Sequence, residues 1–246
     1  MSAAAPIAAF CRTAGDLLFP PACVHCGGLV EGGGLRHLCP RCERLVTVVQ
    51  PPCCRVCGHP FAGEAREHRV CMHCADLQPA FGSGRTCILL QGPGRSLVHA
   101  LKYHRALYVL EDVAVLARAA AGLIDHLRGA VLVPVPLHPR KERERGYNQS
   151  RLLAECFAAA AGGSTAVAPL LRRVVDTPTQ TLFDRRARQA NLKNAFALRD
   201  RAGINAADHY VLVDDVFTTG STLNACAAVL RRAGAVNLDV VTFGHG

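Results

Sequence analysis

The pattern of hydrophobic and polar positions changes after Cys74. Beyond that point, short apolar runs of strand length alternate with stretches in which Leu and Val recur every three or four residues. The apolar runs predict strands at residues 85–90, 130–133, 167–174, 210–214 and 238–243. The periodic stretches predict helices at residues 96–103, 108–127, 148–161 and 221–233. Because strands and helices take turns, we expect an α/β domain over residues 81–246, with a parallel sheet flanked by helices.

Residues 1–80 carry a different signal, which is the spacing of cysteine. Ten of the chain's thirteen cysteines lie between residues 11 and 74, and eight of these form four C-x2-C pairs. Twelve residues separate the first two pairs, thirteen separate the last two, and the pattern repeats with an offset of 31. The pairs are Cys23 with Cys26, Cys39 with Cys42, Cys54 with Cys57, and Cys71 with Cys74. This internal repeat predicts two similar small modules.

Four thiolates in two pairs suit Zn²⁺, which prefers a tetrahedron of soft ligands and receives two from each tight C-x2-C turn. Gly27 and Gly58 directly follow the second cysteine of a pair, where the backbone turns toward the sulfurs. A disulfide framework is disfavoured because the cysteine count is odd and the opening residues lack a secretory signal. An iron–sulfur cluster uses the same ligands, but the two-plus-two spacing favours zinc. We therefore predict two structural zinc ions with sequential pairing, while a cross-braced arrangement or one vacant site would use the same residues.

The cysteines outside the four pairs have a plainer interpretation. Four of them lie in apolar surroundings and are expected to be small buried side chains: Cys11, Cys87, Cys156 and Cys226. Cys53 directly precedes Cys54 and is a candidate substitute ligand.

A candidate ligand site follows the apolar strand expected at residues 210–214. Two acids, Asp214 and Asp215, end this run, and residues 218–222 form a loop of small hydroxyl side chains with one glycine before the next helix. Two carboxylates at the end of a buried strand are costly unless they bind something. The loop amides and the helix N-terminus would cradle an anion, so we expect a sugar phosphate there. The alternative is an ordinary turn with Ser221 as the helix N-cap, which would leave the two acids unexplained.

The stretch from Val211 to Thr222 closely resembles the phosphoribosyl-pyrophosphate (PRPP) motif of type I phosphoribosyltransferases. Residues 133–150, which end in Arg145-Gly146-Tyr147-Asn148-Gln149-Ser150, and residues 179–196 resemble the ComF family of competence proteins. Leu101-Lys102-Tyr103 also fits this family, whose members carry a cysteine module at the amino end. The resemblance spans residues 20–244. It implies a double zinc ribbon at residues 1–80 fused to a type I phosphoribosyltransferase-like domain at residues 81–246.

The resemblance also implies roles for individual residues. Asp214 and Asp215 would hold the ribose hydroxyls of PRPP, directly or through Mg²⁺, and would be the catalytic pair of an active transferase. The 5′-phosphate would lie on Thr218, Thr219, Gly220, Ser221 and Thr222.

Arginines from two further segments are candidates for the pyrophosphate. Arg140 and Arg145 lie in a basic loop expected at residues 139–147. The alternating Glu142 and Glu144 make a solvated helical turn the alternative for Lys141 and Arg143. Residues 176–191 match the mobile loop of the family. They contribute three candidates for pyrophosphate or nucleic acid: Arg185, Arg186 and Arg188.

Charge and hydropathy bear on the kind of partner that the protein binds and on its location in the cell. The formal net charge is +9, with +1 over residues 1–80 and +8 over the rest. This charge fits an Arg-rich soluble surface or a phosphate-rich partner, and charge alone does not decide between the two. No stretch reaches 18 uninterrupted apolar residues, so we expect no membrane span and a cytoplasmic protein. The four tyrosines are scattered, and no stacking platform for bases is predicted.

Three functions of different classes are consistent with these residues. The first is a ComF-like protein that binds PRPP and single-stranded DNA and is associated with DNA uptake in natural transformation. The second is an active phosphoribosyltransferase that acts on an unidentified small acceptor. The third is a PRPP-sensing scaffold whose ribbons bind a helicase or a DNA-translocation protein.

Overall fold

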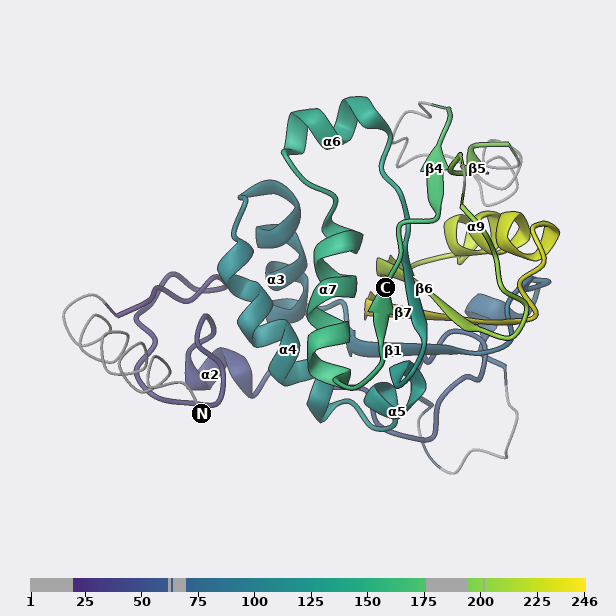
Figure 1. Ribbon diagram of the computed structural model, residues 1–246. Helices are drawn as coiled ribbons and strands as arrows, with labels where there is room; N and C mark the ends of the chain where they lie inside the picture. Colours follow the sequence, from purple (N-terminus) through teal and green to yellow (C-terminus); the bar gives the residue numbers. More distant parts are fainter. Residues whose placement is uncertain (1–19, 62, 64–69, 176–193, 201) are drawn as a thin grey trace.

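A five-stranded parallel sheet forms the centre of the computed structural model, which describes residues 20–61, 63, 70–175, 194–200 and 202–246 (Figure 1). The strand order is β1–β7–β6–β2–β3, and each neighbouring pair is parallel. The strands are β1 (Gly84–Leu89), β2 (Val131–Pro134), β3 (Ala166–Val167), β6 (His209–Phe217) and β7 (Asn237–His245). The predicted α/β architecture is confirmed.

Helices cover both faces of the sheet. One face packs against α3 (Gly92–Tyr103), α4 (Leu110–Ala119), α5 (Leu123–Leu127) and α7 (Gln149–Ala161). The other face packs against α9 (Ser221–Arg232), and Figure 1 shows α9 on the opposite side from α4 and α7. Side chains of β6 alternate between the two layers, because Val211 and Val213 join the first core and Leu212 joins the second. No helix in the described part of the chain has both the length and the apolarity to cross a membrane.

Two predicted elements are divided in the structure. The single helix expected at residues 108–127 is wrong: a 3-10 turn at Leu107–Val109 leads into α4, and α5 follows a break at Gly122, which has φ of 68°. The strand expected at residues 167–174 is also wrong as one element. It divides at Pro169 into β3 and β4 (Leu171–Arg173), and β4 pairs antiparallel with β5 (Phe196–Leu198) outside the main sheet.

The basic loop expected at residues 139–147 contains a helix, α6 (Pro139–Arg145). Its start is favoured by proline at the first position and by His138, whose ring accepts the Arg140 backbone N–H at 3.3 Å. Arg140 and Glu144 form an ion pair at 3.0 Å one turn apart. The helical turn considered for this stretch is therefore present, although Lys141 on it is only partly exposed, and the helix ends at Gly146 with φ of 90°.

The cysteine-rich segment wraps around the edge of the sheet. Between its two cysteine modules, the backbone near Val48 runs antiparallel to β1, with hydrogen bonds from Leu89 N–H to Thr47 O and from Val49 N–H to Cys87 O, both 2.9 Å. The first module, which contains α2 (Pro40–Glu43), packs with the α3 and α4 layer. The second module, which contains the 3-10 turn Met72–Cys74, packs with the α9 layer. The two modules thus lie on opposite faces and cover the edge of β1.

Candidate functional site

The eight paired cysteines form two separate clusters of four. Cys23, Cys26, Cys39 and Cys42 make the first cluster, and Cys54, Cys57, Cys71 and Cys74 make the second; within each, all sulfurs lie within 4.8 Å of one another. This is the sequential pairing that the sequence favours. A zinc–sulfur bond of about 2.3 Å implies sulfur–sulfur edges of about 3.8 Å in a tetrahedron. The Cys26–Cys39 and Cys57–Cys71 sulfurs are 3.8 and 3.5 Å apart, so both donor sets fit structural zinc.

The cysteines outside the clusters are placed largely as expected. Cys87 and Cys226 are fully buried, and burial raises the pKa of both thiols. Cys156 is half-buried, and burial raises its pKa to about 11. Cys53 donates its S–H to the Gln50 carbonyl at 3.1 Å and belongs to neither cluster, while Cys11 lies outside the described residues.

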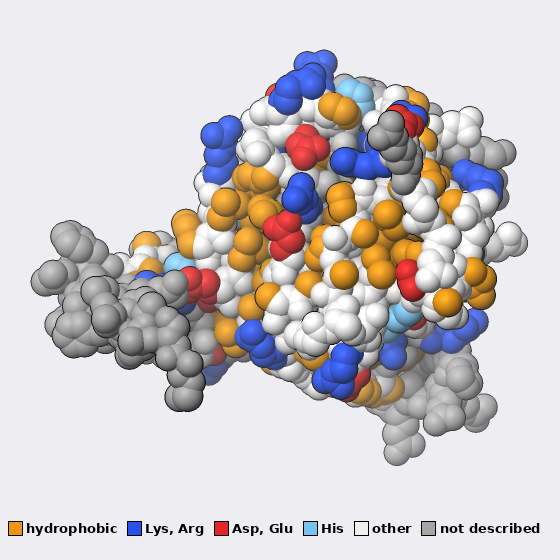
Figure 2. Space-filling model, viewed as in Figure 1, with side chains coloured by type: hydrophobic (Ala, Val, Ile, Leu, Met, Phe, Trp, Pro, Cys, Tyr) orange, Lys and Arg blue, Asp and Glu red, His pale blue; other side chains and the backbone are white. Residues whose placement is uncertain are grey.

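A cavity of about 820 Å³ opens at the carboxyl ends of β2 and β6. Asp214 and Asp215 line it together with cationic side chains of α3, α6 and the turns beside them: Lys102, Arg105, Lys141 and Arg145. The acids lie within β6, which continues to Phe217 beside β7 after its pairing with β2 stops at Val213. The end of the shorter strand therefore leaves space above the acids, at the edge where parallel sheets bind ligands. In Figure 2, Lys and Arg side chains lie over α6 and beside β4 at this end of the molecule.

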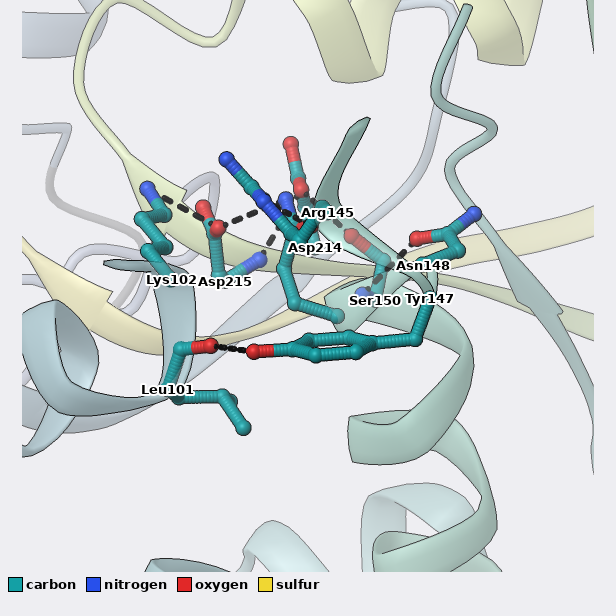
Figure 3. Close-up of polar contacts among 9 residues, drawn as sticks. Leu101, Lys102, Arg145, Tyr147, Asn148, Ser150, Asp214 and Asp215 are labelled. Carbon is teal, nitrogen blue, oxygen red and sulfur yellow. Dashed lines mark hydrogen bonds and ion pairs between the residues drawn. The ribbon is translucent and has the colours of Figure 1, made fainter. Parts of the chain in front are cut away.

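Asp215 is buried and held by two partners, as Figure 3 shows. The Lys102 ammonium lies 2.8 Å from one carboxylate oxygen, and the Gln149 amide donates to the same oxygen at 3.0 Å. The Arg145 guanidinium in turn donates to the Gln149 side-chain carbonyl. A cation from α3 thus neutralises Asp215, and a cation from α6 is aligned above it.

Asp214 accepts hydrogen bonds from the Ser150 hydroxyl and from the Asp215 backbone N–H, both at 2.9 Å. Asn148 fixes this end of α7 because its side chain accepts the Ser150 backbone N–H and donates to the Val135 carbonyl, both at 3.0 Å. Burial and then the neighbouring charge of Asp215 raise the pKa of Asp214 to about 7.

The loop after β6 has the form of an anion cradle. Gly220 has φ of 72°, and a Cβ there would lie 2.6 Å from Phe217 Cζ, so only glycine fits. α9 starts at Ser221, with Gly220 as N-cap, and the Thr219 and Ser221 hydroxyls are 2.9 Å apart. The alternative in which Ser221 is the N-cap is therefore wrong. A small hollow of about 30 Å³ lies between Asp214 and this loop and is lined by every residue from Thr218 to Leu223.

The predicted arginines separate into three groups. Arg145 lines the cavity and contacts the network at Asp215. Arg140 does not line it: its side chain is 69% exposed and pairs with Glu144. Lys141, the next residue, lines the cavity instead. The candidates Arg185, Arg186 and Arg188 lie outside the described residues.

Three side chains of the site received no role from the sequence. Lys102, Gln149 and Ser150 stand in the Leu101-Lys102-Tyr103 and Asn148-Gln149-Ser150 stretches, and they contact the acids only because α3 and α7 both reach the end of β6. Tyr147 is a support, since its ring packs between helices and its hydroxyl donates to the Leu101 carbonyl (Figure 3). The two sequence motifs that contain these residues were the only signal that they could be functional. Their contacts with Asp214 and Asp215 are visible only in the folded structure.

Comparisons with known proteins identify a matching family model and several relatives of the chain. Residues 14–87 match the double zinc ribbon domain family. The chain is 34% identical to DNA utilization protein YhgH of Salmonella typhi over 216 residues, 84% of this chain and 88% of that protein. It is 28% identical to competence protein F of Haemophilus influenzae over 89% of this chain and 94% of that protein. A solved hypoxanthine phosphoribosyltransferase of Staphylococcus aureus aligns at 14% identity over 55% of this chain and 62% of that chain, with a TM-score of 0.35.

The fold and the site define a double zinc ribbon joined to a parallel α/β domain. Sequence identity to YhgH, which extends over most of both chains, then shows the family. The chain belongs to the ComF family, with DNA utilization protein YhgH and competence protein F as relatives.

Proposed function

We propose that this protein binds PRPP with Mg²⁺ in the cavity at the end of β6 and handles single-stranded DNA during DNA uptake. The observation that carries the PRPP proposal is the pair Asp214 and Asp215 beside an amide-rich loop in one cavity. The ribose hydroxyls are suited to the carboxylates, and the 5′-phosphate is suited to residues 218–222. The pyrophosphate would face Arg145 and Lys141, which line the same cavity.

The carboxylates also fit the metal. Mg²⁺ prefers carboxylate oxygens together with substrate phosphates, and it retains several waters. Lys102 already compensates Asp215, whereas Asp214 receives only neutral donors from Ser150 and the backbone. Asp214 is therefore the carboxylate we assign to Mg²⁺ or to the ribose hydroxyls, and the ion would supply charge compensation for the phosphates.

The DNA component rests on the family and on charge. The relatives are named for DNA utilization and competence, and residues 81–246 carry nearly all of the net positive charge. The eight clustered thiols suit a reducing compartment, so we place the protein in the cytoplasm, where single strands would be received.

Fragments of PRPP test the assignment of the subsites. We expect unlabelled ribose 5-phosphate and pyrophosphate each to displace radiolabelled PRPP in equilibrium dialysis with Mg²⁺. Arg145→Gln should weaken competition by pyrophosphate about tenfold and leave ribose 5-phosphate nearly unchanged, because one charge-assisted contact contributes about 1.5–3 kcal/mol. Ser221→Ala should have the opposite effect. Arg128→Gln, on an exposed ion pair with Asp125, serves as the matched control. Equal effects of both variants on both fragments would contradict the assignment.

A further inference from the structure

The exposed face of α3 carries a row of basic and aromatic side chains that leads to the cavity. Arg95, His99 and Tyr103 are spaced four residues apart and therefore share one face of the helix. All three are exposed, and Tyr103 is 63% exposed although it also lines the cavity. An exposed tyrosine at the mouth of a cationic cavity is a surface for a planar ligand.

Contacts connect this row to the floor of the site. The His99 and Tyr103 ring centroids are 4.6 Å apart, and the Arg145 guanidinium carbon lies 5.8 Å over the Tyr103 ring. Arg145 donates to Gln149, which donates to Asp215. A ligand stacked on Tyr103 would therefore lie beside the residues assigned to PRPP.

Basic side chains predominate along the row. The sequence has no acidic residue between Asp76 and Glu111, a range that includes all of α3. Arg105 follows the helix with φ of 52°, a conformation rare for a side-chain-bearing residue, and it donates to the Glu144 carbonyl at 3.4 Å. The Glu144 carboxylate at this edge is paired with Arg140. The row therefore presents positive charge and an aromatic surface, and the nearby Glu144 carboxylate is neutralised by Arg140.

The other end of the row meets the first ribbon. The Ser96 hydroxyl of α3 lies 2.9 Å from Nδ1 of His25, which stands between the ribbon's first two cysteines. The exposed face of α3 thus runs from the first ribbon to the cavity.

From this geometry we infer that the α3 row is a binding path for single-stranded nucleic acid, with a base stacked on Tyr103 and backbone phosphates on Arg95 and Arg105. The inference rests on the proposed DNA function and gives that function a location. Stacking on tyrosine requires an unpaired base, because the faces of bases in a duplex are already stacked. Cations on either side of an aromatic ring match a strand whose phosphates flank each base.

Fluorescence anisotropy with a labelled oligo-dT of about 20 nucleotides tests this path. Tyr103→Ala should weaken binding about tenfold, and Tyr103→Phe should stay within about twofold of the unaltered protein because the ring is retained. Tyr108→Ala is the matched control, since Tyr108 is also exposed but contacts His37 outside the row. Duplex DNA of the same length should compete poorly.

The variant Arg95→Ala tests the nucleic-acid path without altering the PRPP site, because Arg95 does not line the cavity. For oligo-dT binding by this variant, the slope of log K against the logarithm of salt concentration should be smaller in magnitude by about 0.7. This is the value for one lost phosphate contact. The variant's affinity for PRPP should not change. Binding of oligo-dT that neither Tyr103→Ala nor Arg95→Ala weakens would overturn the path alone. Absence of any binding by the unaltered protein would overturn both the path and the proposed DNA function.

Discussion

Asp214 and Asp215 are adjacent in the sequence but have different electrostatic environments. Asp215 is compensated by Lys102 at 2.8 Å. Asp214 has only neutral hydrogen-bond donors, and burial with the neighbouring carboxylate raises its pKa to about 7. A carboxyl group destabilised in this way is suited to receive a ligand that brings a cation or hydroxyl donors. Ionised Asp214 should therefore lower folding stability, and a bound cation or hydroxyl donor should offset that cost.

This arrangement predicts a stability gain on neutralisation of Asp214. The folded pKa of about 7 exceeds the ordinary value of 3.8, so the folded state binds more protons and stability falls as pH rises from about 4 to 7. Asp214→Asn removes that loss. We expect its Tm at pH 8 to exceed that of the unaltered protein by about 2–4 °C, equivalent to ~1 kcal/mol, and the difference to vanish near pH 4. Thermal denaturation at both pH values measures this, and a lower Tm at pH 8 would contradict it.

At the scale of elements, the loop between β6 and α9 depends on one glycine. Gly220 combines positive φ with a close approach to Phe217, and a Cβ added at this position would also lie 3.0 Å from Leu77 of the second ribbon. Phe217 of β6 and Leu77 of the second ribbon therefore both restrict the position of the loop. The loop backbone at Gly220 cannot shift without moving one of these neighbours.

Gly220→Ala should move the cradle. We expect a loss of about 1 kcal/mol or more in stability from the positive φ, with a further loss from the clash at Phe217. Affinity for ribose 5-phosphate should fall at least tenfold in equilibrium dialysis. Gly163→Ala is the matched control, because Gly163 has φ of 66° but no atom within 4 Å of an added Cβ. It should lose stability alone, and equal losses of affinity in both variants would refute the role of the close approach.

The elements also show where sequence reasoning succeeds and where it ends. β6 and the following loop were predictable because a buried strand, two acids and a glycine turn are all local signals. α6 was expected as a loop because its stability comes from a proline start and an ion pair on an otherwise exposed segment. β4 pairs with β5, a partner too short and too distant in sequence to give a signal of its own. The convergence of Lys102 and Gln149 on Asp215 is a tertiary property that no single segment encodes.

In the whole molecule, the two ribbons enclose the edge of the sheet. The first anchors to the α4 layer, because Asp112 accepts the backbone N–H groups of Arg36 and His37 at 2.7 and 2.9 Å. The second anchors to β1, where the Thr86 hydroxyl donates to the Cys57 carbonyl at 2.8 Å. The spacing of cysteines predicts both ribbons, but their placement on opposite faces depends on these long-range contacts.

This placement predicts different consequences for the two zinc sites. Mass spectrometry of unoxidised protein should give about two zinc ions per chain, and less than one would refute the assignment. Cys54→Ser should weaken PRPP binding more than Cys23→Ser, because Leu77 of the second ribbon lies beside the loop between β6 and α9. Both variants should lower Tm, since a structural zinc site contributes to folding. Equal PRPP affinity in both variants would show that the second ribbon does not support the loop.

Calorimetric titration determines whether Asp214 and Asp215 form the floor of a PRPP site. The zinc-loaded protein is titrated with PRPP in the presence of Mg²⁺, beside the double variant Asp214→Asn/Asp215→Asn. We predict one site with a Kd in the micromolar range, and no measurable binding by a double variant that remains folded. Absence of binding by the unaltered protein, or equal binding by the double variant, would show that these two carboxylates do not form a PRPP site.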